Sequence, residues 1–333
     1  MSTSSLHTAH HRFHAKTTTS TSTAKALIVA AQSYGRQFNA FAHESTASAI
    51  FTMDGSQISP PPKNHSRLEK LVHLPTVQSL HGIAQVSVSS GHETYIVIGG
   101  KQTGLNDPVK GQFKHVKARK ISDTSEQSAF HNGVASIPSA NNAVLISDST
   151  VGIVGYLNVT THDFGTSTFV FQERATPPGA SFTIGVNGIR VRDSYLYWTN
   201  SFLFSLFRMP INLLGYSVPD AMPELVANLS SSFTVADDFA FGSNGGVYIA
   251  TNFDNSVTCV DTTTRVTTTV VGSKDNLLVA GSTAVVFGKG DEGEALYVST
   301  SGALAAPVNG TVTEGAKVVA VEIASSELPL RAC

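Results

Sequence analysis

The chain has 333 residues, of which 41% are hydrophobic and 14% are charged, and its mean hydropathy of +0.05 is typical of a well-buried globular protein rather than a disordered one. A formal net charge of −2 gives no electrostatic reason to expect nucleic acid or an anionic membrane as a partner. No apolar run approaches the roughly 20 residues that a membrane-spanning helix needs.

Short apolar runs begin close to the start of the chain. Residues 26–31 are predicted to form the innermost strand of a first small sheet, followed by strands at 37–42, 48–53 and 70–74. Residues 11–16 are predicted to pair with residues 317–323 near the other end of the chain. Such pairing would close a ring of sheets and remove its exposed edges.

A strand rich in aromatic and β-branched residues then recurs five times. It begins at residues 95, 144, 196, 247 and 296, so the intervals are 49, 52, 51 and 49 residues. Outer strands are predicted to follow at 113–119, 169–172, 223–228 and 266–271. A steady period near 50, built of short strands without a helical pattern, is typical of propeller blades. The sequence therefore predicts an all-β fold, a six-bladed β-propeller, as a single domain over residues 11–325. Residues 1–10 and 326–333 are expected to be tails.

A polar pair precedes each of these strands and is predicted to be a turn at the start of the innermost strand. The pairs are His81-Gly82, Asn132-Gly133, Asn187-Gly188, Asp237-Asp238 and Ser282-Thr283, with a first turn expected near Lys25. Because innermost strands face a shared axis, six side chains are predicted to converge there: Lys25, His81, Asn132, Asn187, Asp237 and Ser282. Asn and Asp oxygens suit Ca²⁺ or Mg²⁺, but the same residues are favoured in tight turns for backbone reasons alone, so both interpretations stay open.

The chain contains two cysteines, Cys259 and Cys333, and no disulfide framework is expected to hold the fold together. Cys259 is interpreted as a small core residue. Asn-x-Ser/Thr sequons begin at Asn64, Asn158, Asn228 and Asn309. No signal peptide is recognised, because the run at 26–31 is shorter than a usual signal core. The expected location is cytoplasmic, or the secretory pathway if the native start differs.

Four segments in fixed order resemble a known family. HNGVASIP…VLISDS, VNGIRVRDSYLYWTNS…LFRMPI, ADDFAFGSNGGVYIATNFDNSV and STAVVFG…LYVSTSG are similar to the blades of senescence marker protein/gluconolactonase-like six-bladed propellers, in their fungal secondary-metabolism branch. The resemblance covers roughly residues 70–323. It is more specific for the fold than for the reaction.

The metalloenzymes of this family hold one divalent cation on the axis, and its ligands are a Glu, two Asn and an Asp. The resemblance implies that this chain has related residues there. Asn132, Asn187 and Asp237 match the last three residues. The Glu has no counterpart, because Lys25 or an apolar neighbour such as Leu27 stands at its place. A lysine ammonium could occupy the place of the ion and pair with Asp237. Metal-dependent lactone hydrolysis is therefore the alternative prediction, with one Ca²⁺ or Mg²⁺.

Members of the fungal branch are also found in natural-product gene clusters. Some of these members resemble this chain and are hetero-Diels–Alderases that join a quinone methide to a terpene alkene. Such a reaction needs no cofactor or metal, only an apolar funnel and donors on a carbonyl oxygen. Lys25 and His81 are the predicted donors, and Asn132 and Asn187 orient the reactants. Predicted substrate-binding residues at the same face are Phe130, His131, Phe182, Phe202, Phe233 and Ser282.

The leading prediction is thus a cofactor-independent cyclase acting on a hydrophobic small molecule. A metal-dependent lactonase and a non-catalytic binding propeller remain alternatives, since fold alone does not fix function.

Overall fold

The computed structural model describes residues 17–21, 27–34, 37–44, 47–54, 69–74, 79–87, 93–100, 120–124, 127–166, 174–176, 179, 183–230, 235–288, 295–323 and 333. Before residue 80 it describes the backbone alone. The predicted tail at 1–10 and the strand predicted at 11–16 lie outside the described residues.

Among the described residues, the strands form five four-stranded antiparallel sheets and one two-stranded sheet. The first sheet contains β2 (Leu27–Tyr34), β3 (Gln37–Glu44), β4 (Ala47–Asp54) and β5 (Glu69–Leu74). The two-stranded sheet contains β6 (Ser79–Ser87) and β7 (Glu93–Gly100). The third contains β8 (His131–Ile137), β9 (Ala140–Asp148), β10 (Ile153–Asn158) and β11 (Phe164–Thr166).

The remaining three sheets follow the same order from the inner to the outer strand. One contains β12 (Val186–Arg192), β13 (Tyr195–Asn200), β14 (Ser205–Pro210) and β15 (Glu224–Asn228). The next contains β16 (Phe239–Phe241), β17 (Val247–Thr251), β18 (Ser256–Val260) and β19 (Thr267–Gly272), with a 3₁₀ turn, η2 (Asn252–Asp254), after β17. The last contains β20 (Ser282–Phe287), β21 (Ala295–Thr300), β22 (Lys317–Glu322) and β1 (Thr17–Thr21).

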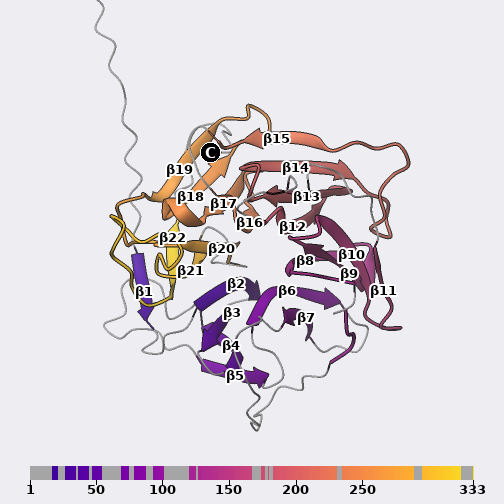
Figure 1. Ribbon diagram of the computed structural model, residues 1–333, viewed down its shortest axis with the longest axis horizontal. Helices are drawn as coiled ribbons and strands as arrows, with labels where there is room; N and C mark the ends of the chain where they lie inside the picture. Colours follow the sequence, from indigo (N-terminus) through magenta and orange to yellow (C-terminus); the bar gives the residue numbers. More distant parts are fainter. Residues whose placement is uncertain are drawn as a thin grey trace, which may run out of the picture.

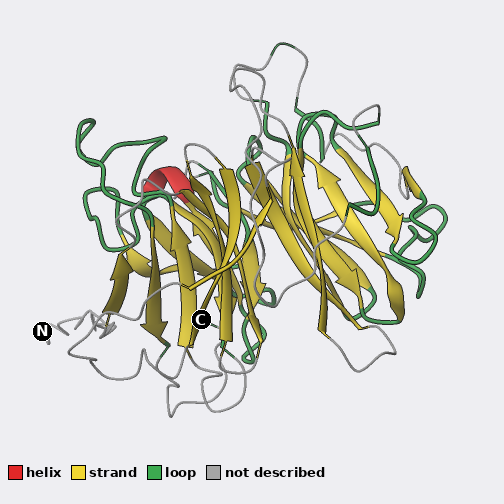
Figure 2. Ribbon diagram, turned by 90° about the horizontal axis from the view of Figure 1, so that it is seen from below, coloured by secondary structure: helices red, strands yellow, loops and turns green. Residues whose placement is uncertain are grey.

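The sheets are arranged as a ring (Figure 1). Each innermost strand contacts the innermost strand of the next sheet, in the order β2, β6, β8, β12, β16, β20 and back to β2. Seen from the side, the strands stand next to one another and the loops gather at their two ends (Figure 2). The predicted all-β, propeller-like fold is confirmed. All five recurring strands lie where the sequence predicts them, in β7, β9, β13, β17 and β21.

The strand that joins the two ends of the chain lies later than predicted. β1 pairs with β22 from Thr17↔Val321 to Thr21↔Lys317, so the pairing involves residues 17–21 rather than 11–16. The partner segment at 317–323 is predicted correctly. The sequence of β1 is Thr-Thr-Thr-Ser-Thr, and β-branched threonines favour the extended backbone more than the histidine-rich segment before them does.

The outer strand of the third sheet also differs from the prediction, which placed it at 169–172. The side-chain oxygen of Asn158 accepts hydrogen bonds from the backbone N–H groups of Thr160 and Thr161, at 2.9 and 3.0 Å. This tight turn returns the chain at once, and β11 pairs with β10 already at Phe164. Residues 169–172, like the strand predicted at 113–119, lie outside the described residues.

Apolar side chains pack between neighbouring sheets. Trp198 on β13 is fully buried and stacks on Phe207 of β14, with ring centroids 5.6 Å apart. It belongs to a cluster with Ile189 on β12 and with Leu145 and Val154 of the preceding sheet. The prediction of Trp198 as a core residue is confirmed, and this packing fixes the spacing between the sheets that carry the axis.

The expectation that no disulfide stabilises the fold is wrong. Cys259 on β18 is buried and forms a disulfide with Cys333, 74 residues further along the chain, with the two Cα atoms 5.8 Å apart. The intervening chain contains β19, β20, β21 and β22, so the bond ties residue 333 to a strand of the fifth sheet. Sequence spacing alone cannot reveal this contact, because the two residues are 74 positions apart and meet only in the folded chain.

We expect Cys333→Ser to lower the free energy of unfolding by roughly 4 kcal/mol, because the unfolded chain regains the freedom of a long loop. Urea denaturation of the oxidised wild type and the variant measures this difference. Adding a reductant should lower the stability of the wild type to that of Cys333→Ser and leave the variant unchanged. Equal stability of both oxidised proteins would contradict the prediction.

Candidate functional site at the propeller axis

Three of the polar pairs predicted as turns lie inside innermost strands at a β-bulge, whereas Asp237-Asp238 directly precedes β16. The pairing register shifts between Leu80 and Ile83 in β6, between His131 and Val134 in β8, and between Val186 and Ile189 in β12. A bulge adds one residue to a strand and redirects the side chains next to it. Here it directs His81, Asn132 and Asn187 toward the axis, so the predicted convergence is correct although its local cause is different.

The glycines of these pairs allow the innermost strands to approach one another closely. A Cβ atom at Gly133 would lie 2.5 Å from the carbonyl oxygen of Asn187, and one at Gly188 would lie 2.3 Å from Oδ1 of Asp238. Both distances are shorter than real contacts, so a side chain here would push the next sheet outward. Glycine is therefore required for the ring to close around a narrow axis.

The same register identifies the equivalent axis position in every sheet. We call these the axis residues: Val29, His81, Asn132, Asn187, Asp237 and Thr283. Lys25 lies outside the described residues, and the register assigns the first position to Val29 instead. Ser282 precedes the axis position by one residue. It is fully buried and donates a hydrogen bond to the carbonyl oxygen of Ser256 at 2.6 Å, so its role is structural.

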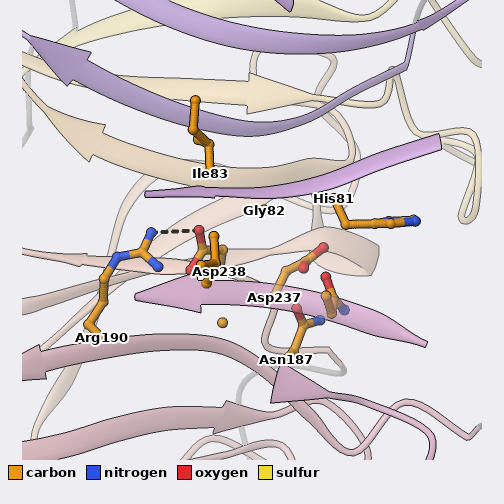
Figure 3. A pocket seen from close by; sticks show the side chains of 11 residues that line it. His81, Gly82, Ile83, Asn187, Arg190, Asp237 and Asp238 are labelled. Atoms are coloured by element: carbon orange, nitrogen blue, oxygen red, sulfur yellow. Dashed lines mark hydrogen bonds and ion pairs between the residues drawn. The ribbon is translucent and has the colours of Figure 1, made fainter. Parts of the chain in front are cut away.

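Four axis residues line one small cavity (Figure 3). The cavity is lined by the axis residues His81, Asn132, Asn187 and Asp237. Its other lining residues are Ile83, Val134, Arg190, Asp238 and the glycines of the bulges. Its volume is about 10 Å³, roughly the space of one water molecule. It can thus hold a single polar atom, such as a carbonyl oxygen, whereas the rest of a larger ligand would have to lie above it.

Three axis residues, Asn132, Asn187 and Asp237, are each held by a partner at one equivalent position after the second strand. Asn132 donates from Nδ2 to Ser149 Oγ at 3.1 Å, and Asn187 donates from Nδ2 to Ser201 Oγ at 2.9 Å. Ser201 Oγ in turn donates to the carbonyl oxygen of Ala236 at 2.6 Å, so it must accept from the amide nitrogen. These bonds fix the orientation of both amides.

In the fifth sheet the roles of donor and acceptor in this pair are exchanged. Asp237 can accept where the asparagines donate, and the serine position is occupied by Asn252, whose Nδ2 donates to Asp237 Oδ2 at 2.9 Å. A serine at this position that donated its hydroxyl hydrogen to a backbone carbonyl, as Ser201 does, would leave the carboxylate of Asp237 without a donor. Asn252 is not among the predicted site residues, although its alignment with Ser149 and Ser201 in the repeat identifies it.

The carboxyl group of Asp237 is surrounded by protein except toward the cavity. Burial raises its pKa to about 7; hydrogen bonds from Asn252 and Asn187 oppose the shift, and the charge of Asp238 adds to it. Close to neutral pH this group therefore exists in both protonation states. In its protonated form it can donate a hydrogen bond to an acceptor in the cavity.

Asp238 forms an ion pair beside the cavity. Its Oδ2 accepts a hydrogen bond from Arg190 Nη2 at 2.6 Å (Figure 3), and its Oδ1 accepts one from the backbone N–H of Phe239 at 2.8 Å. Arg190 projects from β12, the innermost strand of the preceding sheet. The pair neutralises the second carboxylate of the cavity and ties two neighbouring sheets together.

The segment before β8 brings one predicted aromatic residue to the axis. The ring of Phe130 contacts the ring of His81 edge to face, with centroids 4.9 Å apart. His131 instead packs on Phe164 at 5.5 Å, and its Nδ1 lies 3.3 Å from the hydroxyl of Thr124. Burial lowers the pKa of His131, although the charge of Asp148 acts in the opposite direction. His131 does not line the axial cavity.

Asp148 anchors the same segment. Its Oδ2 accepts hydrogen bonds from Ser128 Oγ at 2.5 Å and from the backbone N–H of Ala129 at 2.7 Å, while Oδ1 accepts from Val151 N–H at 2.9 Å. Burial alone would raise the pKa of Asp148, but these hydrogen bonds outweigh it and lower the pKa. The carboxylate therefore holds Phe130 next to His81.

We expect Asp148→Ala to lower the free energy of unfolding by about 2–4 kcal/mol, because several backbone donors lose their acceptor. Chemical denaturation at pH 7 measures the change. Asp275→Ala is the matched control, since Asp275 is exposed in a turn, and it should change stability by less than about 0.5 kcal/mol. Equal effects of the two substitutions would contradict the anchoring role of Asp148.

The other aromatic residues predicted to bind substrate do not line the cavity or cannot be placed. Phe202 follows β13, is partly exposed, and donates its backbone N–H to the carbonyl oxygen of Ile184 at 3.0 Å. Phe182 and Phe233 lie outside the described residues. Their assignment as funnel residues stays a prediction.

The axis offers only part of the ligand set that the metalloenzymes of the resembling family imply. Asn132, Asn187 and Asp237 converge, but the position of the Glu is Val29, a residue without a ligand atom. Within the part of the chain that the structure describes, no cluster of three or more His, Cys, Asp or Glu is suited to a metal ion. The donor set therefore does not fit a four-ligand protein site for the cation.

Comparison with known proteins finds no matching family model. A protein of Phoma sp named "Putative hetero-Diels-Alderase" is 26% identical over 287 residues, which span 77% of this chain and 80% of the relative. This similarity extends over most of the propeller and is not limited to one motif.

Solved structures with the same fold are more distant in sequence. A luciferin-regenerating enzyme superposes with a TM-score of 0.61 at 10% identity and covers 94% of this chain and 98% of its own. Regucalcin of Agrobacterium tumefaciens, a calcium-binding protein, superposes with a TM-score of 0.54 at 13% identity, covering 92% and 94%.

No described helix is both long and apolar enough to cross a membrane. The similarity to the Phoma protein and the fold shared with these structures agree with the blade motifs of the sequence. The chain is thus similar over most of its length to the Phoma protein, and it shares its fold with the luciferin-regenerating enzyme and regucalcin.

Proposed function

We propose that the protein is a cofactor-independent cyclase of fungal natural-product biosynthesis that catalyses a hetero-Diels–Alder reaction between a quinone methide-type polyketide and a terpene alkene. The observation that carries this proposal is the similarity to the Phoma protein, which covers 77% of the chain. The fold neighbours support an enzyme of the propeller type, and the axial cavity supports the form of catalysis.

The reaction needs no atom or electron from outside. The conjugated C=C–C=O unit of the quinone methide adds to the alkene, so that one C–C bond and one C–O bond form and the remaining double bond moves between the former diene carbons. Nothing leaves and nothing is oxidised. The protein therefore has to hold both reactants in a reactive geometry and stabilise the carbonyl oxygen as its electron density rises.

The axial cavity suits the second task. It has room for one oxygen atom, and its walls carry potential donors in His81 and in the carboxyl group of Asp237. A hydrogen bond to one lone pair of the substrate oxygen leaves the face of the conjugated system open to the alkene. Asn132 and Asn187, whose amides are fixed by Ser149 and Ser201, orient the substrate.

The carbon skeletons of the quinone methide and the alkene would lie above the axial cavity, against aromatic residues. Phe130 is held there by its contact with His81. Phe182, Phe202 and Phe233 are proposed as further walls of the funnel. We also propose six complete blades, in which the outer strands of the β6–β7 sheet come from residues outside those described, and a protein that uses neither metal nor cofactor.

Metal-dependent lactone hydrolysis is the second candidate, favoured by the convergence of Asn132, Asn187 and Asp237 on one cavity. It differs from the cyclase in its requirement for a cation and for the negative charge of Asp237. With Val29 at the first axis position, water molecules would have to supply the missing ligands.

Two assays run side by side test both candidates. In the first, an ortho-quinone methide released in situ is mixed with a trisubstituted terpene alkene; in the second, an aldonolactone is the substrate. Each is run after exhaustive chelation and after addition of Ca²⁺ or Mg²⁺. We expect chelator-insensitive, enantioselective cycloaddition. Lactone hydrolysis that disappears on chelation and returns with metal, without any cycloaddition, would refute the cyclase and establish the hydrolase.

A further inference from the structure

Two asparagines of the predicted sequons lie in exposed turns at the rim of the propeller. Asn228 ends β15, the outermost strand of its sheet, and is exposed together with Ser230 of the same sequon. Asn309 lies between β21 and β22 with a left-handed backbone (φ 51°) and is exposed together with Thr311. Neither asparagine lines the axial cavity.

Local hydrogen bonds hold both turns open to solvent. Asn228 Oδ1 accepts from the backbone N–H of Ser230 at 2.9 Å and from its hydroxyl at 2.6 Å, so the side chains of the sequon lie next to each other. In the other turn, Gly310 N–H donates to the carbonyl oxygen of Pro307 at 2.9 Å. A large group on either asparagine would extend into solvent without disturbing the packing between sheets.

The disulfide between Cys259 and Cys333 is an independent indication of the compartment. Such bonds persist in the oxidising secretory pathway and are rare in the reducing cytosol. Its formation removes two electrons and two protons from the thiols, which a disulfide-carrying oxidant accepts as it becomes a dithiol. In eukaryotic cells the same compartment modifies Asn-x-Ser/Thr sequons.

We propose that Asn228 and Asn309 carry N-linked glycans, and that the protein matures in the secretory pathway. In each transfer, the bond between the sugar and the diphosphate of a lipid-linked oligosaccharide breaks, a C–N bond to Nδ2 forms, Nδ2 loses a proton and the lipid diphosphate leaves. The glycan on Asn228 shields the edge of β15, which among the described strands pairs with β14 alone and would otherwise offer unpaired backbone groups to another chain.

The third described sequon provides a contrast. Asn158 ends β10 and is only partly exposed, whereas Asn228 and Asn309 are both exposed. A glycan there would lie against the outer strands of the third sheet. Asn228 and Asn309 are therefore the assigned sites, and Asn158 is not one of them.

The test is peptide mass spectrometry of the full-length protein purified from a filamentous fungus that expresses the gene with its natural upstream sequence. Treatment with peptide N-glycosidase in H₂¹⁸O should convert Asn228 and Asn309 to ¹⁸O-labelled Asp, and a non-reduced digest should contain the Cys259–Cys333 cross-link. Asn228 and Asn309 recovered unmodified in every molecule would overturn the proposal, as would free thiols at both cysteines.

Matched variants separate loss of the glycan from loss of the fold. Thr311→Ala removes the sequon of Asn309 and should lower the mass of the secreted protein by one glycan, whereas Thr313→Ala, in the same exposed turn, should leave the mass of the glycoprotein unchanged. Ser230→Ala should likewise remove the glycan of Asn228, and Ser230→Thr should keep it. A glycan retained in Thr311→Ala and Ser230→Ala would overturn the assignment of these two sites.

Discussion

Replacing Asp237 with alanine is expected to lower the rate of cycloaddition by about 10²–10³-fold, the usual effect of removing one donor from a site that stabilises developing charge on oxygen. Asp237→Asn should keep activity within about tenfold of the wild type. Asparagine has nearly the same shape, its carbonyl oxygen can still accept the hydrogen bond from Asn252, and its amide nitrogen then faces the cavity as a donor. Single-turnover kinetics with the quinone methide and the alkene measure both effects.

The same pair of variants distinguishes the two candidate functions. A metal ligand needs the negative charge of Asp237, so the hydrolase predicts that Asp237→Asn is as inactive as Asp237→Ala. The cyclase predicts a clear difference between them. Circular dichroism and thermal unfolding of each variant provide the control for folding. Two folded variants that are equally inactive would show that the carboxyl group does not act as a hydrogen-bond donor.

The pH dependence of cycloaddition should follow the protonation of Asp237. Burial raises the pKa of this carboxyl group to about 7, so the donor is present below pH 7 and is lost above it. The wild-type rate should be constant below about pH 6 and fall by up to tenfold for each pH unit above 7. Asp237→Asn carries no proton that titrates here, and its rate should not change across the same range. A wild-type rate that rises with pH would contradict the account.

The stability of the fold should show the same titration. The pKa is raised from 3.8 in the unfolded chain to about 7 in the fold, so this group's contribution to stability is fully present below pH 4 and is lost as the pH rises to 7. The loss amounts to a few kcal/mol at most, since one pKa unit corresponds to about 1.4 kcal/mol and the carboxyl group remains open toward the cavity. Urea unfolding at pH 4.5 and pH 8 should show a larger decrease for the wild type than for Asp237→Asn.

The repeat made most of the fold predictable from the sequence. The recurring strand near Tyr95, Val144, Leu196, Val247 and Leu296 has a period too regular for unrelated hairpins, and all five positions are strands in the structure. The convergence of His81, Asn132, Asn187 and Asp237 follows from the same repeat, because equivalent positions of successive innermost strands face one axis.

What the sequence did not reveal depends on register and on long-range contacts. A periodicity argument cannot detect a shift of one or a few residues. It therefore predicts Ser282 where Thr283 is equivalent, and Lys25 where the bulge register selects Val29. Arg190 approaches Asp238 only because β12 and β16 lie side by side. The bond between Cys259 and Cys333 joins residues that no local pattern connects.

The central claim is that the polar side chains of the axial cavity promote cycloaddition without a metal. Its most direct test is the enantiomeric excess of the cycloadduct formed by exhaustively chelated wild-type protein from an ortho-quinone methide and a terpene alkene. We predict a large excess of one enantiomer, reduced toward the racemic background in Asp237→Ala. A racemic product formed at the rate of the protein-free reaction would contradict the account.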